Sequence, residues 1–271
     1  MTNTTPIPIP MSSPDITDAE RQAVLEVLNT PNLAMGPRID EFEEVIAAYD
    51  GAKHAIADNS GTAGLHLCVR AADVRENDLV VTTPFSFVAS TNVLLFEKAI
   101  PVFVDIDPLT GNIDTFKAAE AVKEVQQGGT ALRRWLPRKG AEHPASLKAL
   151  LAVDVFGQPA DYDSLRRITS SAGIKLIEDS CESLGAEYKD RRTGVLGDMG
   201  VFAFYPNKQI TTGEGGIIVT NDDQADHHMR ALRSQGRAPG DTWLQHTYLG
   251  YNYRMDEMSA ALGHSQLKRL D

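Results

Sequence analysis

Lys208 lies in a part of the chain where lysine is unusual. Nine uncharged residues precede it and QITTGEGGIIVT follows it, so we expect a strand, a tight loop and a second strand here. Burial among apolar neighbours disfavours the ammonium form of lysine and leaves more free amine. A free amine is the nucleophile that forms a Schiff base. A structural lysine is the alternative, although the glycines of GEGG indicate close backbone packing around a ligand.

Carboxylates follow a predicted strand in the segment KLIEDSCES. Glu178 and Asp179 end this strand, and Glu182 comes three residues after Asp179. A carboxylate at the carboxyl end of a strand can pair with a cationic ring nitrogen or can cap the following turn, and both interpretations stay open. Cys181 is flanked by these carboxylates, which disfavour its thiolate, so we expect no nucleophilic role for it.

A run of small residues joins a predicted strand to a predicted helix in DNSGTAGLHL, residues 58–67. Small residues let the backbone approach a ligand, and the free N–H groups at a helix start favour a phosphate. A plain helix cap by Ser60 or Thr62 is the alternative. Phe85 and Phe87 follow another strand end, where one ring can cover a flat heterocycle, with placement in the core as the alternative.

The elements that must position these residues alternate along the chain. After two helices, the first with a capping box of Thr17 and Glu20, strands are predicted at 54–58, 78–83, 100–106, 150–156, 174–179 and 216–220, and helices at 62–72, 89–99 and 161–172. Such alternation is typical of an α/β fold with a mostly parallel central sheet and helices on both faces. Ligands of such sheets bind beyond the carboxyl ends of the strands.

Composition narrows the class of protein. The 271 residues carry 26 Lys and Arg against 37 Asp and Glu, a net charge of −11. This balance argues against nucleic acid or an anionic membrane as partner. Two cysteines are too few for a disulfide framework, and the polar, proline-rich start has no signal core, so we expect a cytoplasmic protein.

The order of these features resembles the fold-type I pyridoxal-phosphate enzymes, and more narrowly the DegT/DnrJ/EryC1/StrS family of sugar aminotransferases. The stretches that carry the resemblance are SGTAGLHL, TTPFSFVAST, VFGQPADYDSL, IEDSCESLGAEY, FYPNKQITTGEGGIIVTND and LGYNYRMDEMSAALG. They occur in family order and span nearly the whole chain. The expected fold is therefore the large, cofactor-binding domain of this family.

The resemblance implies a role for each matching residue around pyridoxal 5'-phosphate. Lys208 would form the Schiff base with the cofactor, and Asp179 would hold the N–H of its pyridinium ring. Phe87 would stack on that ring. Glu182 matches a position near the ring hydroxyl where the family usually carries His or Gln, and some members carry Glu. No metal is expected.

Other matching residues concern the phosphate. Gly61, Thr62 and Ala63 would offer it N–H and hydroxyl donors. Asn252 matches an asparagine that, in family dimers, reaches the phosphate of the neighbouring subunit, so the resemblance also implies a homodimer. The chain departs from the family at Ala203, where a serine that helps bind phosphate is usual.

The implied reaction moves an amino group from an amino acid, L-glutamate by family analogy, to a keto-sugar linked to a nucleotide. Arg233, Arg237 and Arg254 are unranked candidates for the donor carboxylate. A catalytically impaired regulatory or interaction homologue is an alternative function. A sugar dehydratase of the same family is a second, which Lys208 disfavours because those enzymes replace the lysine, usually with histidine.

The domain division follows the same resemblance. We expect an N-terminal arm and first helix at 1–30, the cofactor-binding large domain at 31–254, and at 255–271 the start of a helix that leads, in the family, to a small C-terminal domain absent from this chain. Residues 124–148 read as an insertion between strands. Its basic part, Arg133 to Lys139, either attracts a nucleotide diphosphate or forms a solvated loop.

Overall fold

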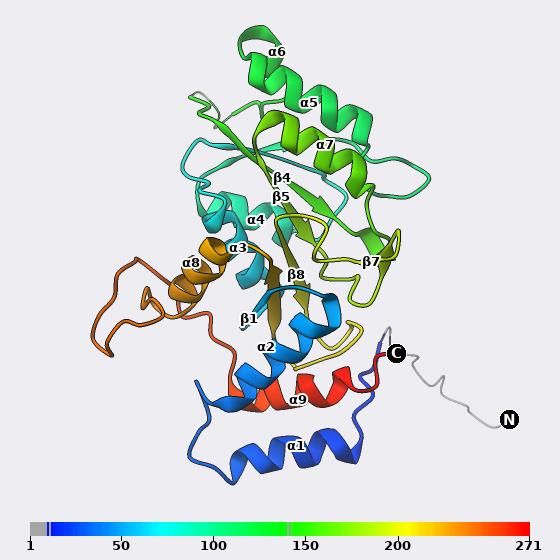
Figure 1. Cartoon of the computed structure of the whole chain (residues 1–271). Coiled ribbons are helices and arrows are strands. Elements are labelled where there is room, and N and C mark those ends of the chain that lie inside the picture. The colour runs from blue at the N-terminus through cyan, green and yellow to red at the C-terminus, as the bar shows by residue number, and fades with distance from the viewer. Residues whose placement is uncertain (1–9, 11, 140, 142) are drawn as a thin grey trace, which may run out of the picture.

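A seven-stranded sheet forms the centre of the computed structural model, which describes residues 10, 12–139, 141 and 143–271 (Figure 1). In spatial order the strands are β1 (His54–Asp58), β9 (Gly216–Thr220), β8 (Met199–Ala203), β5 (Lys175–Asp179), β4 (Leu147–Val153), β2 (Leu79–Thr82) and β3 (Ile100–Phe103). β9 runs antiparallel to both its neighbours, and the other strands share one direction. Their carboxyl ends therefore meet at one edge, as the predicted mostly parallel sheet requires.

Both faces of the sheet are covered by helices, as predicted. One face packs on α3 (Gly61–Ala71), α4 (Ala89–Phe96) and α8 (Asp223–Arg233). The opposite face carries α5 (Thr115–Gln127) and α7 (Tyr162–Ala172) over β2 to β5, and α2 (Pro37–Asp50) and α9 (Glu257–Leu267) over β1, β8 and β9. Successive residues of a strand point to opposite faces, so Leu176 and Ile177 of β5 enter different core clusters.

The N- and C-terminal parts of the described chain lie against each other. α1 (Asp18–Leu28) begins with the predicted capping box of Thr17 and Glu20. The Oε1 atom of Glu20 accepts a hydrogen bond of 2.9 Å from Ser265 of α9, and α1 packs along α9 below α2 (Figure 1). The predicted domain boundaries stay a prediction, and much of the predicted N-terminal arm (residues 1–9 and 11) lies outside the described residues.

The segment read as an insertion contains the end of α5, the short helix α6 (Gly129–Arg133) and the start of β4. Its Arg134 pairs with Glu120 and Glu124 of α5. The strand predicted at 150–156 is wrong at its end: β4 stops at Val153, and η1 (Val155–Gly157) follows, because the left-handed backbone of Phe156 cannot continue a strand. The small strands β6 (Glu187–Tyr188) and β7 (Arg191–Arg192), together with α5 and α8, had no counterpart in the predicted elements. None of the helices in the described ranges is long and apolar enough to cross a membrane.

Candidate active site

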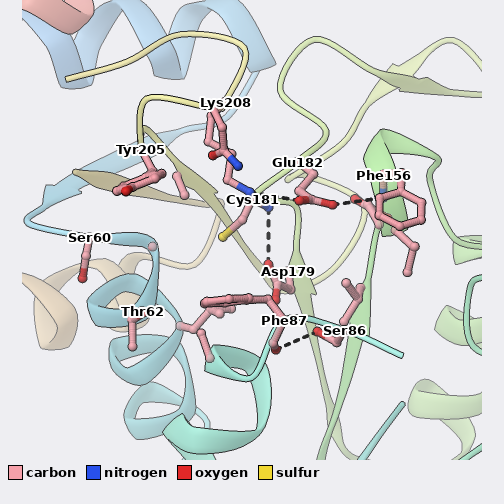
Figure 2. A pocket seen from close by; sticks show the side chains of 18 of the residues that line it. Ser60, Thr62, Ser86, Phe87, Phe156, Asp179, Cys181, Glu182, Tyr205 and Lys208 are labelled. Carbon is pink, nitrogen blue, oxygen red and sulfur yellow. Dashed lines mark hydrogen bonds and ion pairs between the residues drawn. The ribbon is translucent and has the colours of Figure 1, made fainter. Parts of the chain in front are cut away.

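A cavity of about 650 Å³ opens at the carboxyl edge of the sheet (Figure 2). It is lined by the loops after β2, β4, β5 and β8 and by the start of α3. Six residues predicted for the site line it: Gly61, Thr62, Phe87, Asp179, Glu182 and Lys208. Figure 2 shows Lys208 on one side of the cavity and Asp179 on the other, with Thr62 and Phe156 at its two ends. Lys208 and Asp179 therefore face one shared space, although they are 29 positions apart in sequence.

The amine of Lys208 is ion-paired. Its Nζ atom lies 3.0 Å from Oε1 of Glu182, and its side chain is 16% exposed. The expectation of an amine held only among apolar neighbours is wrong, because the turn after β5 brings this carboxylate across the cavity. The other oxygen of Glu182 accepts the backbone N–H of Phe156 at 3.1 Å. Both carboxylate oxygens of Glu182 are therefore used, one of them by the amine.

Asp179 and Glu178 face opposite sides of β5, since side chains alternate along a strand. Oδ2 of Asp179 accepts a hydrogen bond of 2.5 Å from Ser90, and its Oδ1 accepts the N–H of Cys181. Glu178 instead accepts the N–H groups of Gly194 and Gly197 on the other face. Burial raises the pKa of Glu178 to about 8. Of the two carboxylates, Asp179 faces the cavity and Glu178 supports a loop.

The start of α3 forms one wall of the cavity. Ser60 caps the helix and accepts the N–H of Ala63 at 3.1 Å, so the N-cap interpretation is confirmed and Ala63 itself does not line the cavity. The N–H groups of Gly61 and Thr62 belong to the first turn, which has no acceptor within the helix. A Cβ on Gly61 would lie 2.7 Å from Cβ of Ala203. Glycine therefore lets this helix start approach β8 closely.

Aromatic side chains line the mouth of the cavity. Phe85 and Phe87 are 45% and 78% exposed, so their placement in the core is excluded. Phe156 and Tyr205 also line this cavity and are exposed. The site can therefore offer ring faces to a flat or partly apolar ligand.

Asn252 is exposed and does not line the cavity of its own chain. Its neighbours Tyr251 and Tyr253 stack on each other with centroids 4.8 Å apart. Their hydroxyls bond to Glu97 and His66, at 3.2 and 3.0 Å. The two tyrosines thus anchor the segment while Asn252 projects outward between them.

The three candidate arginines are not equivalent. Arg233 forms an ion pair with Glu43, and its side chain is 14% exposed. Its guanidinium is therefore already paired within the protein. Arg237 stacks over Trp243 at 4.2 Å, and Arg254 bonds to the side chain of Gln235. None of the three lines the cavity in this chain.

Cys68 is buried, whereas Cys181 is partly exposed and lines the cavity. Burial, and then the carboxylate of Asp179, raises the pKa of the Cys181 thiol well above its usual value, which is consistent with the predicted non-nucleophilic role. Among the described residues, no group of three His, Cys, Asp or Glu side chains is arranged to hold a metal ion.

Sequence reasoning missed two buried polar residues that support the site. Ser90 is fully buried in α4 and donates a hydrogen bond to Asp179. The hydroxyl of Ser86 is hydrogen-bonded to the hydroxyl of Ser90 at 2.6 Å. Asp154 accepts hydrogen bonds from Ser180 and Ser183, which brace the turn that follows Asp179. A serine on the apolar face of a predicted helix and an aspartate inside a predicted apolar strand were the available signals.

Comparison with known proteins agrees with this geometry. Residues 14–271 match the DegT/DnrJ/EryC1/StrS aminotransferase family. The chain belongs to this family. This is a family of aminotransferases. The match therefore indicates pyridoxal phosphate as the cofactor.

Individual members of the family are similar over nearly the whole chain. GDP-perosamine synthase of Caulobacter vibrioides is 38% identical over 97% of this chain and 65% of its own length. The UDP-4-amino-4,6-dideoxy-N-acetyl-beta-L-altrosamine transaminase of Campylobacter jejuni is 34% identical over 97% of this chain and 65% of its own. The structure of Helicobacter pylori PseC, an aminotransferase of pseudoaminic acid biosynthesis, superposes with a TM-score of 0.80 at 33% identity, covering 96% of this chain and 65% of that one. The chain thus spans a little less than two thirds of these relatives.

The residues of the cavity suit the family's cofactor. The N–H groups of Gly61 and Thr62, which have no acceptor within α3, are donors of the kind a phosphate group requires. Asp179 offers a buried carboxylate to a ring N–H, and Lys208 offers an amine on the other side of the same cavity. The structure therefore has a complementary group for each end of the cofactor.

Proposed function

We propose that this chain carries the cofactor site of an aminotransferase that moves an amino group from an amino acid, L-glutamate, to a keto-sugar linked to a nucleotide. The observation that carries the proposal is the shared cavity of Lys208 and Asp179, with the start of α3 beside them. The family match and the amino-sugar names of the relatives support the substrate class. The free cysteines suit a reducing cytoplasm, where we expect the protein to act.

In this proposal each residue has a defined task. Pyridoxal phosphate, when bound, supplies an electron-withdrawing ring that stabilises negative charge at the substrate carbon. Asp179 holds the proton on the ring nitrogen, and Phe87 covers the ring. Gly61 and Thr62 would offer donors to the phosphate, whereas the N–H of Ala63, also predicted for this role, is taken by Ser60. Lys208 would hold the cofactor through its amine, and the same amine would act as the base that removes and returns the substrate proton.

Glu182 has two tasks. Its carboxylate holds the amine of Lys208 in the cavity, 3.0 Å away, before the cofactor binds. By the family resemblance, the same carboxylate would also serve the ring hydroxyl of the cofactor. We also propose a homodimer in which Asn252 reaches the phosphate of the partner's cofactor, because Asn252 is exposed and does not line the cavity of its own chain.

An absorption experiment tests the proposal. Purified protein mixed with pyridoxal phosphate should show a visible band that bleaches when L-glutamate is added. Addition of a nucleotide-linked keto-sugar should then restore the band. A band that ignores glutamate contradicts amino transfer from this donor, and no band at all favours a regulatory or interaction homologue.

Lys208→Ala should abolish the visible band and the covalent retention of cofactor after borohydride reduction. Lys189→Ala, which changes an exposed lysine paired with Asp163, serves as the control and should keep both. Retention of the band by the Lys208 variant would refute the assignment of that lysine.

A further inference from the structure

Asp58 places a buried carboxyl group directly behind the start of α3. The residue ends β1, is fully buried and does not line the cavity. Its Oδ1 atom accepts the backbone N–H of Ser60 at 3.2 Å. Its Oδ2 atom is buried and has no hydrogen-bond partner among the described residues. A buried carboxyl oxygen without a partner costs free energy and is unusual in a native core.

Two glycines make room for this carboxyl group. A Cβ on Gly64, near the start of α3, would lie 2.7 Å from Oδ2 of Asp58. Gly216 of β9 pairs with Asp58 of β1 in the sheet. A Cβ on Gly216 would lie 2.5 Å from Oδ1 of Asp58 and 2.7 Å from the backbone nitrogen of Gly61. The carboxyl group is therefore enclosed between α3 and β9, against the backbone that begins the helix.

The turn in front of Asp58 is the cavity wall that carries the proposed phosphate donors. Ser60, Gly61 and Thr62 all line the cavity, and Figure 2 shows Ser60 and Thr62 on this wall. Asp58 accepts the N–H of Ser60, and the hydroxyl of Ser60 accepts the N–H of Ala63. The two N–H groups between them, of Gly61 and Thr62, have no acceptor within α3. Asp58 thus holds from behind the turn that presents these two donors to the cavity.

The surroundings of Asp58 favour its uncharged form. Burial raises the pKa of Asp58 well above its usual value, and the N–H of Ser60 and the guanidinium of Arg233 only partly oppose the rise. Arg233 is itself paired with Glu43, whose charge raises the pKa of Asp58 further. The titratable groups near Asp58 are Arg233 of α8, Glu43 of α2, Cys68 of α3 and Cys181 after β5. Burial also raises the pKa of both thiols, so they add no charge.

We propose that Asp58 is a positioning residue for the phosphate of the cofactor: as an uncharged acid it fixes the turn that presents the N–H groups of Gly61 and Thr62. This inference rests on the proposed function for the position of the phosphate. An apolar side chain at position 58 would leave the N–H of Ser60 without its acceptor. An ionised carboxylate would hold the turn but would repel a phosphate on its other side.

The test compares pyridoxal phosphate with pyridoxal, which lacks the phosphate. Both probes carry the same ring and aldehyde, so the ratio of their Kd values measures the contribution of the phosphate. Equilibrium dialysis against the full chain, freed of cofactor, gives both values. Asp58→Ala removes the acceptor behind the turn, so it should raise the Kd for pyridoxal phosphate about fivefold. The Kd for pyridoxal should stay within about twofold of the native value.

Asp58→Asn tests the charge. The amide keeps the shape of the side chain and the acceptor for Ser60, and it cannot ionise. The ratio of Kd values should therefore stay within about twofold of the native ratio. Tighter binding of pyridoxal phosphate than this range allows would show that the native carboxylate is ionised and opposes the phosphate. Weaker binding would show that a neutral acceptor is not sufficient. Either result contradicts the proposal, also where the alanine variant does not fold.

Asp50→Ala is the matched control. Asp50 is also a buried aspartate whose carboxyl oxygens have no hydrogen-bond partner in the described ranges, and it does not line the cavity. Its replacement should leave the ratio of Kd values unchanged. Thermal midpoints, measured for every variant without cofactor, show which of them are folded.

The inference is overturned if Asp58→Ala weakens the binding of both probes equally or of neither, because the side chain would then serve only the fold. If the native protein binds pyridoxal phosphate no more tightly than pyridoxal, the proposed phosphate site fails, and this inference fails with it. If the native protein binds the cofactor but transfers no amine from glutamate, the proposed amino transfer fails while the role of Asp58 stands.

Discussion

At the scale of single residues, two adjacent carboxylates in one strand have unrelated environments. Asp179 faces the cavity and accepts from Ser90, while Glu178 faces the opposite side and accepts backbone N–H groups. Lys208 shows the same dependence on surroundings, because its partner Glu182 comes from another loop. The type of a residue indicates what chemistry it can do, and its neighbours decide whether it does so.

Ala203 offers a prediction at this scale. It lines the cavity where the family usually carries serine, and its Cβ is close to Gly61 at the start of α3. Ala203→Ser should add a hydroxyl donor to the phosphate and lower the Kd for pyridoxal phosphate by about fivefold, since one hydrogen bond contributes about 1 kcal/mol. Titration of the apoprotein, followed by fluorescence, measures this.

The control for that measurement is Ala203→Val, which adds volume without a donor and should weaken binding. Equal affinities for the native protein and the serine variant would contradict a phosphate position beside Ala203.

At the scale of elements, a side chain from one helix caps the N-terminus of another. Glu257, the first residue of α9, is buried and accepts the N–H groups of Gly36, Arg38 and Ile39 at the start of α2. These groups have no acceptor within their own helix, and the helix dipole favours a negative charge there. The contact joins residues more than two hundred positions apart in the chain.

Glu257→Ala should therefore lower the free energy of unfolding by about 2–4 kcal/mol, because it leaves several buried donors without a partner. Urea denaturation followed by circular dichroism measures this. Glu44→Ala, on the exposed face of α2, is the control and should stay within about 0.5 kcal/mol of the native protein. A similarly small effect at position 257 would show that solvent replaces the carboxylate.

At the scale of the whole molecule, a buried carboxylate makes stability depend on pH. Asp50 ends α2 with neither oxygen hydrogen-bonded within the described residues, and burial raises its pKa to about 7 although Arg192 opposes the shift. Its usual pKa is about 3.9, so between the two values the unfolded chain releases a proton that the folded protein keeps. This group therefore costs stability as the pH rises from about 4 to 7.

Asp50→Asn removes that titration. At pH 8 the variant should be more stable than the native protein by on the order of 2–4 kcal/mol, and the difference should shrink towards pH 4. Denaturant titrations at several pH values give the comparison, with the exposed Asp190→Asn as the control. A gain that is independent of pH would rule out ionisation of Asp50 as its cause.

The proposed dimer leads to a prediction for mixed subunits. Lys208→Ala and Asn252→Ala should each inactivate the site to which the changed residue belongs. If Asn252 serves the neighbouring subunit, a mixed dimer keeps one intact site, so an equal mixture should regain about a quarter of the native activity. Unmixed variants are the controls, and no recovery after subunit exchange would place Asn252 in its own chain's site.

Much of the fold followed from the sequence alone. The alternation of apolar strands with amphipathic helices predicted the covered, mostly parallel sheet, and Thr17 with Glu20 predicted the start of α1. Such signals are local, because periodicity and capping involve residues only a few positions apart. The residue types at 179, 182 and 208 likewise indicated the chemistry, and the family match supports it.

Tertiary structure alone decided which of these residues meet. The pairing of Lys208 with Glu182, the hydrogen bond from Ser90 to Asp179, and the hydrogen bond from the backbone of Phe156 to Glu182 each join separate segments of the chain. No local pattern encodes such contacts, because they depend on the order of the strands in the sheet and on which strand ends share an edge. The sequence by itself thus determined the kinds of element and the available chemistry, and the packing of the sheet determined the geometry of the site.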